Sequence, residues 1–172
     1  AMSDKQNLLA RMALKVSHWA RRNTTARSRE NISAHYDLGN DFFSLFLDPS
    51  MMYSSAVYPT PDSDLATAAQ HKLRLICEDL ELTPEDHLVE IGTGWGGMAI
   101  FAAEHYGCRV TTTTISREQF DYTVAAVANK GLQDRITVLF DDYRDLQGRF
   151  DKLVSIEMIE AVGHHYLDTY IN

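Results

Sequence analysis

The stretch that decides the fold is residues 88–97, which read LVEIGTGWGG. A short apolar run leads directly into a cluster of glycines, and an apolar segment at 98–106 follows the cluster. This order predicts a strand, a tight loop and a helix. Glycine lets the backbone turn sharply and approach a ligand closely, and the first turn of a helix offers unpaired N–H groups. The stretch therefore predicts a ligand-binding loop between a first strand and its helix.

The alternation of strand and helix continues along the chain. Its expected strands are 87–91, 109–115, 136–140 and 152–156, and its expected helices are 98–106 and 117–130. The connections between strands are too long for hairpins, so they are expected to be right-handed βαβ crossovers. We therefore expect an α/β fold built on a parallel sheet.

Residues 31–82 have a different, mainly helical pattern. The run FFSLFL at 42–47 predicts a short helix, and three prolines between 49 and 61 predict an irregular exit from it. Asp64 can cap a following helix, on whose apolar face Cys77 falls. We divide the chain into an N-terminal arm (1–30), a helical cap or substrate segment (31–82) and a ligand-binding domain (83–172).

Charge is divided unevenly between the arm and the rest of the chain. Residues 1–30 hold seven Lys or Arg and two acidic residues, whereas the remainder holds nine basic and 22 acidic residues. The arm has a basic amphipathic pattern with Trp19, so it either packs over the domain, which we favour, or lies on an anionic membrane surface. Nucleic acid is not an expected partner, because no base-stacking or groove-reading motif accompanies the charge.

The composition excludes several protein classes. The 172 residues are 45% hydrophobic and 23% charged, as in globular domains rather than disordered chains. No apolar run approaches the roughly 20 residues that span a bilayer. The isolated Cys77 and Cys108 predict neither a disulfide framework nor a metal site. We expect a cytoplasmic protein, with peripheral contact at the inner membrane face if the arm binds lipid.

The number of expected strands indicates a piece of a longer protein. Sheets commonly have about five to six strands, whereas four are expected here, and the sequence stops inside a segment expected to be helical. An uncovered parallel strand exposes apolar surface and an unpaired edge. The alternative is a complete small domain closed by formation of a homo-oligomer.

The glycine loop does not name its ligand by itself. Gly92, Gly94 and Gly97 satisfy the dinucleotide pattern G-x-G-x-x-G. Glu90, however, places a carboxylate before the glycines, where a cationic amino-acid group can bind. The second strand ends in threonines 112–114 and lacks the acid that holds a ribose in dinucleotide folds. Both features favour S-adenosylmethionine over a nicotinamide cofactor. The missing acid also weakens the interpretation as an ordinary methyltransferase, since those enzymes usually keep an acid there. A glycine-rich turn that binds no ligand is a further alternative.

Five motifs occur in a characteristic order along the chain. They are HYDLGNDFFSLFLDPSMMYSSA (35–56), EIGTGWGG (90–97), TTISREQ (113–119), DDYRDL (141–146) and SIEMIEAVGHHYLDTY (155–170). Together they resemble the cyclopropane-fatty-acyl-phospholipid synthases and the mycolic-acid cyclopropane synthases. The resemblance implies a class I methyltransferase fold. It also implies transfer of a methylene unit from S-adenosylmethionine to the cis double bond of an unsaturated phospholipid acyl chain.

The resemblance also implies which residues contact the cofactor. Its methionine end would lie against Tyr53, Ser54, Gly92 and Gly94, its ribose against Thr114, Ile115 and Gln119, and its adenine against Asp142 and Tyr143. Glu90 and Trp95 complete the candidate cofactor-binding residues.

The candidate catalytic residues are Glu160, Ser55, His35 and Tyr36. The resemblance implies that Glu160 helps to hold a bicarbonate ion beside the reacting carbon. Ser55 stands where many relatives have a cysteine, and the family's other bicarbonate ligands, a histidine and a tyrosine, would lie beyond residue 172. His35 is either a site residue or a local hydrogen-bonding residue. Glu157 falls on the same side as Glu160 if this stretch is helical, and a solvated position is favoured for it.

Aromatic side chains are expected to line part of the pocket, because their faces can stabilise positive charge on a substrate. The candidates are Tyr36, Phe42, Phe43, Tyr53, Tyr58 and Trp95, of which two or three are expected to face the ligand. Two other functions stay open: plain methylation of a lipid or small amine, and a non-catalytic binding module.

Overall fold

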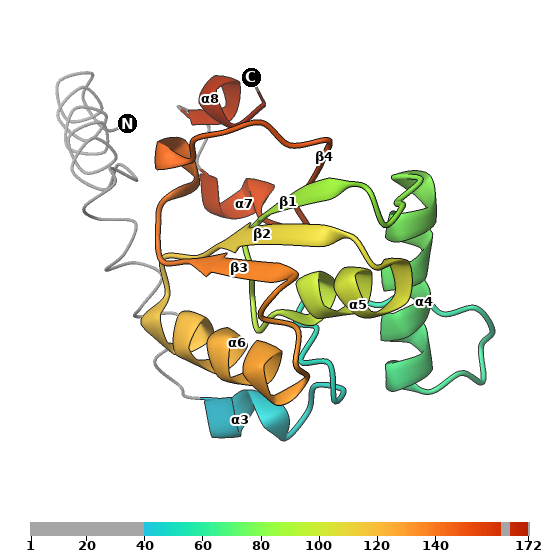
Figure 1. The fold of residues 1–172 in the computed structure, drawn as a ribbon. Helices are drawn as coiled ribbons and strands as arrows, with labels where there is room; N and C mark the ends of the chain where they lie inside the picture. The colour runs from blue at the N-terminus through green and yellow to red at the C-terminus, as the bar shows by residue number, and fades with distance from the viewer. Residues whose placement is uncertain (1–39, 163–165, 172) are drawn as a thin grey trace, which may run out of the picture.

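The computed structural model describes residues 40–162 and 166–171, which form a parallel sheet flanked by helices (Figure 1). The strands are β1 (His87–Ile91), β2 (Arg109–Thr113), β3 (Ile136–Leu139) and β4 (Lys152–Val154), in the order β3-β2-β1-β4. Every pairing is parallel. The predicted α/β fold with a parallel sheet is therefore confirmed. The last three strands are shorter than predicted, because residues such as Ile115 and Ile156 leave the sheet and line a cavity.

The larger helices are α4 (Leu65–Asp79), α5 (Gly97–Tyr106) and α6 (Arg117–Asn129). The β1–α5–β2 and β2–α6–β3 connections advance in the same direction across the sheet, so right-handed crossovers place α5 and α6 on one face. Helix α4 packs against α5 (Figure 1). The shorter elements are α3 (Asn40–Ser44), the 3-10 helix η1 (Tyr143–Asp145), α7 (Ile159–Val162) and α8 (Leu167–Ile171).

Side-chain caps fix where the two longest helices begin. Asp64 accepts a hydrogen bond from the Thr67 amide at 2.7 Å, as the sequence predicts for the start of α4. Ser116 caps the start of α6 in the same way: its hydroxyl oxygen accepts a hydrogen bond from the backbone N–H of Gln119 at 3.3 Å. The short helix α3 begins two residues before the predicted one and ends earlier, at Ser44, whose hydroxyl donates to the Asp41 carbonyl.

The main core lies between the sheet and helices α4 and α5. Its fully buried members include Leu73, Leu88, Met98 and Val110. Cys77 is completely buried in the same core, and burial raises the pKa of its thiol to about 12. This confirms its predicted place on the apolar face of α4. Helix α4 therefore shares one core with the sheet, although it precedes the predicted boundary at residue 83; the division into domains stays a prediction.

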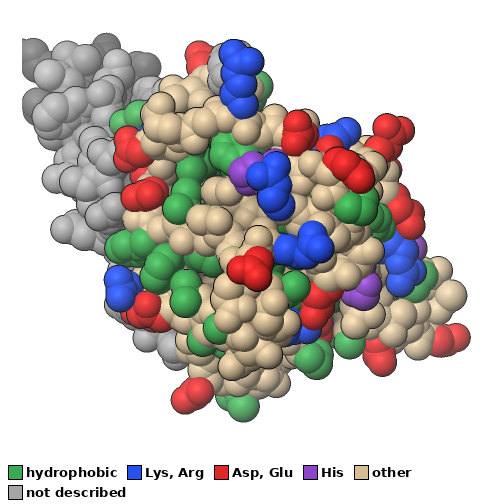
Figure 2. Space-filling view, in the orientation of Figure 1, with side chains coloured by type: hydrophobic (Ala, Val, Ile, Leu, Met, Phe, Trp, Pro, Cys, Tyr) green, Lys and Arg blue, Asp and Glu red, His purple; other side chains and the backbone are tan. Residues whose placement is uncertain are grey.

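The described residues contain neither a membrane-spanning helix nor a cluster of metal ligands. Among them, no helix is both long and apolar enough to cross a membrane, and no group of three or more His, Cys, Asp or Glu can hold a metal ion. Figure 2 shows acidic and basic side chains interspersed over much of the visible face.

Gly96 in the loop before α5 provides a test of this packing. Its backbone is left-handed (φ +86°), and a Cβ there would lie 2.7 Å from the Thr123 methyl carbon. Gly131 is also left-handed (φ +67°), but nothing lies within 4 Å of its Cβ position. We expect Gly131→Ala to cost about 1 kcal/mol through its φ alone, and Gly96→Ala about 3 kcal/mol because overpacking is added, both measured by urea unfolding.

Thr123→Ser removes the methyl group involved and should restore about 1 kcal/mol or more in the Gly96→Ala background. Equal losses for the two alanine variants, or no recovery with serine, would show that the Thr123 contact does not govern this loop.

Candidate functional site

A cavity of about 800 Å³ lies at the carboxyl edge of the sheet. Its wall is built from the segments that follow β1, β2, β3 and β4, together with residues 51–54. Open α/β folds bind ligands at this edge, and the volume is typical of a small-molecule site. The cavity is therefore the candidate functional site.

The structure brings most of the predicted site residues to this cavity. The eleven candidate cofactor-binding residues all line it: Tyr53, Ser54, Glu90, Gly92, Gly94, Trp95, Thr114, Ile115, Gln119, Asp142 and Tyr143. Glu160 lines it as well. Ser55 is not part of the lining but contacts a residue that is. His35, Tyr36 and the basic arm lie outside the described residues.

Residues 51–55, which we call the strap, pass close to the glycine loop. A Cβ at Gly97 would lie 2.8 Å from the Ser50 carbonyl oxygen and 3.1 Å from the Met52 methyl carbon. At Gly94, by contrast, nothing lies within 4 Å of the Cβ position. The two glycines thus serve different purposes. Gly97 lets residues 50–52 pack closely against the loop, and Gly94 leaves a space that a ligand can approach.

Glu90 is a buried carboxyl group at the end of β1. Its Oε2 accepts a hydrogen bond from the Thr112 hydroxyl at 2.7 Å, and that hydroxyl lies 2.7 Å from the Thr93 hydroxyl. Burial raises the pKa of Glu90 to about 8, although the bond from Thr112 acts in the opposite direction. At neutral pH the group is therefore mostly protonated, and a cation beside it would favour its ionised form.

The segment between β2 and α6 orients an amide in the cavity wall. The Thr114 hydroxyl donates to Gln119 Oε1 at 2.9 Å, and both residues are buried. The bond identifies the oxygen end of the Gln119 amide as the acceptor toward Thr114. Gln119 is consequently held in one orientation in the first turn of α6.

Asp142 is engaged by a residue that the sequence interpretation did not single out. Arg144 Nε donates to Oδ1 at 2.8 Å, and Arg144 Nη2 donates to Oδ2 at 2.6 Å. The guanidinium carbon also lies 5.6 Å from the centre of the Tyr143 ring. Asp142 therefore meets the cavity as part of an ion pair, and its orientation is fixed by two bonds from one guanidinium.

Two of the aromatic candidates line the cavity, and a third packs behind them. Trp95 donates its indole N–H to Asn40 Oδ1 at 2.7 Å, and its ring lies 4.7 Å from that of Phe43. The Tyr53 ring meets the Phe43 ring edge-to-face at 5.5 Å. Phe42 and Tyr58 are exposed and do not line the cavity.

Glu157 and Glu160 do not share a helix, so the condition under which they would lie on one side is not met. Helix α7 begins at Ile159, and Glu157 has a left-handed backbone (φ +49°) before it. The Glu157 carboxylate instead turns to the strap and accepts from the Ser55 amide at 3.1 Å and the Ser55 hydroxyl at 2.6 Å. The sequence pattern carries no signal for this backbone conformation.

Lys72 is a second residue that the sequence interpretation missed. It is buried in α4, and its Nζ donates to the Ser54 hydroxyl at 2.5 Å. The available signal was its position: Lys72 follows Ala68 and Ala69 on the apolar face of α4, where a lysine is unusual unless its charge has a partner.

Curated relatives match most of this chain. The cyclopropane-fatty-acyl-phospholipid synthase of Escherichia coli (strain K12) is 47% identical over 136 residues, which are 79% of this chain and 34% of the relative. The probable fatty acid methyltransferase of Pseudomonas putida is 45% identical over 143 residues, 82% of this chain and 36% of the relative. The chain thus spans about a third of the length of these relatives.

The fold and the family are shown by two further comparisons. The crystal structure of mycolic acid cyclopropane synthase CmaA1 complexed with SAH and CTAB superposes with a TM-score of 0.79 at 35% identity, over 83% of this chain and 50% of that one. The fold is that of the class I S-adenosylmethionine-dependent methyltransferases. The family model described as mycolic acid cyclopropane synthetase matches residues 23–172, so the chain belongs to the mycolic acid cyclopropane synthetase family.

Proposed function

We propose that the cavity binds S-adenosylmethionine and that the full-length protein transfers a methylene unit to the cis double bond of an unsaturated phospholipid acyl chain, forming a cyclopropane ring. The observation that carries this proposal is the convergence on one cavity of the strap and the three loops that follow β1, β2 and β3. Each loop contributes residues that the family resemblance had assigned to the cofactor. The similarity to CmaA1, whose structure was solved with SAH, supports the same ligand.

The chemistry of the lining fits the parts of this cofactor. Glu90 would pair with the amino group of the methionine end, Thr114 and Gln119 would hold the ribose, and Asp142 with Tyr143 would border the adenine. When bound, the cofactor supplies an electrophilic methyl group on a sulfonium. Tyr53 and Trp95 present aromatic faces that stabilise positive charge, by about 0.5–2 kcal/mol each.

Glu160 is the proposed catalytic carboxylate. It lies in the first turn of α7 and lines the cavity. By family resemblance Glu160 would help to hold a bicarbonate ion, which would supply a base beside the reacting carbon for the proton that is lost on ring closure. His35, Tyr36 and Ser55 remain predicted participants. A cytoplasmic location with peripheral membrane contact remains a prediction based on the arm and the lipid substrate.

Methylation without ring closure is the second candidate. The similarity to the probable fatty acid methyltransferase of Pseudomonas putida favours it, because that protein is almost as similar to this chain as the synthase is. Both reactions need the same cofactor site, so they differ in what happens after the methyl group is transferred.

The cofactor class is tested by titration calorimetry of the full-length protein with S-adenosylmethionine, SAH and NAD. We expect the first two to bind and NAD not to bind. Gln119→Ala should weaken SAH binding about tenfold, because a buried amide contact is lost. Gln147→Ala, at an exposed position outside the cavity lining, is the matched control and should bind as the wild type does. Preferential binding of NAD would refute the assignment.

The raised pKa of Glu90 predicts that cofactor binding depends on pH. Because Glu90 is protonated below about pH 8 and an ammonium partner favours the carboxylate, binding should release a proton. Affinity for SAH should therefore rise between pH 6 and pH 7.5, by at most about tenfold per pH unit. Glu90→Gln should flatten this dependence, and calorimetry in buffers of different ionisation enthalpy should show that it also abolishes proton release. An equally steep profile in the variant would assign the titration to another group.

The product decides between the two reactions. We expect unsaturated phospholipids incubated with full-length protein and S-adenosylmethionine to gain one CH₂ unit by mass spectrometry and to resist catalytic hydrogenation, as a ring does. A methyl-branched chain or a methylated amine would instead support plain methylation. Reactions without protein provide the baseline.

A further inference from the structure

We propose that Lys72 and Glu157 are positioning residues that anchor the strap, residues 51–55, from two different elements and so hold it as a wall of the cavity. The inference rests on the proposed function, because Tyr53 and Ser54 in this wall are proposed to contact the cofactor. Neither anchor is among the residues that the family motifs assigned to the site.

Lys72 holds the strap from α4. Its side chain is only 7% exposed, and its Nζ donates to Ser54 Oγ at 2.5 Å. The Ser54 hydroxyl in turn donates to Met52 Sδ at 3.2 Å. Burial lowers the pKa of Lys72, while the charges of Glu157 and Asp48 favour its ammonium form. A buried ammonium needs such partners, since an isolated one is costly.

Glu157 holds the next strap residue from the loop between β4 and α7. Its carboxylate accepts from both the amide and the hydroxyl of Ser55, at 3.1 and 2.6 Å. To do so, the Glu157 backbone adopts a left-handed conformation that is strained for a residue with a Cβ. Strain of this kind persists where surrounding contacts require it, often at functional sites.

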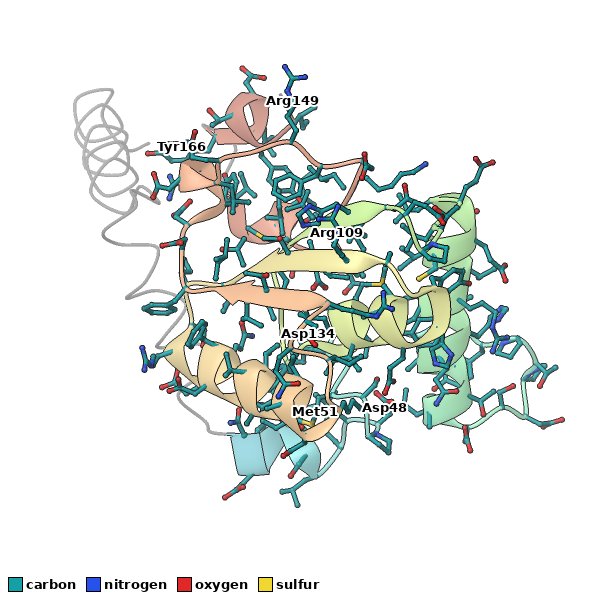
Figure 3. All side chains as sticks on the ribbon, in the orientation of Figure 1. Asp48, Met51, Arg109, Asp134, Arg149 and Tyr166 are labelled. Carbon is teal, nitrogen blue, oxygen red and sulfur yellow. The ribbon has the colours of Figure 1, made fainter. Side chains whose placement is uncertain are left out.

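The N-terminal side of the strap is also held by hydrogen bonds, in this case to the Asp48 carboxylate. Buried Asp48 accepts from the Ser50 amide at 3.0 Å, the Ser50 hydroxyl at 2.9 Å and the Met52 amide at 3.3 Å. Figure 3 labels Asp48 and Met51 in this segment, which leads from α3 toward α4. The Ser50 carbonyl sits against Gly97, so the segment rests directly on the glycine loop.

The consequence for function follows from the opposite charges of the two residues that bind the strap. Ser54 is bound to a cation and Ser55 to an anion, so the two neighbouring residues are pulled toward different elements and Tyr53 is held beside them. A wall held in this way is ordered before the ligand arrives, which lowers the entropic cost of binding. Lys72 does not line the cavity, so removing it should weaken cofactor binding through the strap alone, whereas Glu157 also lines the cavity and is therefore read from strap exchange together with SAH affinity.

The test combines hydrogen exchange of the strap with SAH titration in the full-length protein. Lys72→Met and Glu157→Ala should each accelerate exchange of the Met52–Ser55 amides at least about tenfold and weaken SAH about tenfold. Exchange of β1 should stay slow, which shows that the fold is intact. Glu157→Gln keeps an acceptor oxygen and should restore slow exchange in the strap. Lys130→Met and Glu104→Ala, which break a surface ion pair of 2.8 Å, are the matched controls and should change neither readout.

Ser55→Ala supplies a second route if a charged-residue variant does not fold, because it removes the 2.6 Å bond from the strap side. Unchanged exchange in the anchor variants, or faster exchange with unchanged SAH affinity, would overturn the proposal. If the wild type bound no SAH while the anchor variants still loosened the strap, the proposed function would fail and the anchoring would stand.

Discussion

The parallel direction of all four strands is the constraint on which the rest of the structure depends. It brings the carboxyl end of every strand to one edge of the sheet, so residues that are far apart in the sequence become neighbours there. Glu90 is the penultimate residue of β1, Thr114 follows β2, Asp142 follows β3 and Glu160 follows β4. A cavity lined by polar residues from four loops is the direct result.

Two carboxyl groups in this cavity are held in contrasting electrostatic environments. Glu90 is bonded to a threonine hydroxyl and is mostly protonated at neutral pH. Asp142 is paired through two bonds to the guanidinium of Arg144. A cationic group on a ligand can therefore induce the ionisation of Glu90. Asp142 instead offers acceptor oxygens that are fixed in place and whose charge is already balanced by Arg144. This difference gives the cavity a direction along which an elongated ligand can be oriented.

The fold could be predicted from local signals in the sequence, whereas most of the cavity lining was predicted from the family resemblance. The glycines of residues 92–97, the Asp64 cap and the apolar face of α4 each act within a few residues. The parts that could not be predicted depend on long-range pairs or on backbone detail. The Ser55–Glu157 and Ser54–Lys72 bonds join segments that only the folded chain brings together, and the left-handed backbone of Glu157 leaves no pattern in the sequence. Strand ends were predicted too long for a related reason: residues that leave the sheet to line the cavity are as apolar as those within it.

The buried indole of Trp95 has a spectroscopic consequence. It lines the cavity and is held in place by Asn40, so its emission reports directly on what enters the space beside it. The chain has one other tryptophan, Trp19 in the arm. Replacing Trp19 with phenylalanine would leave Trp95, in the wall of the site, as the single tryptophan of these 172 residues. Occupancy could then be followed in real time without attaching a dye.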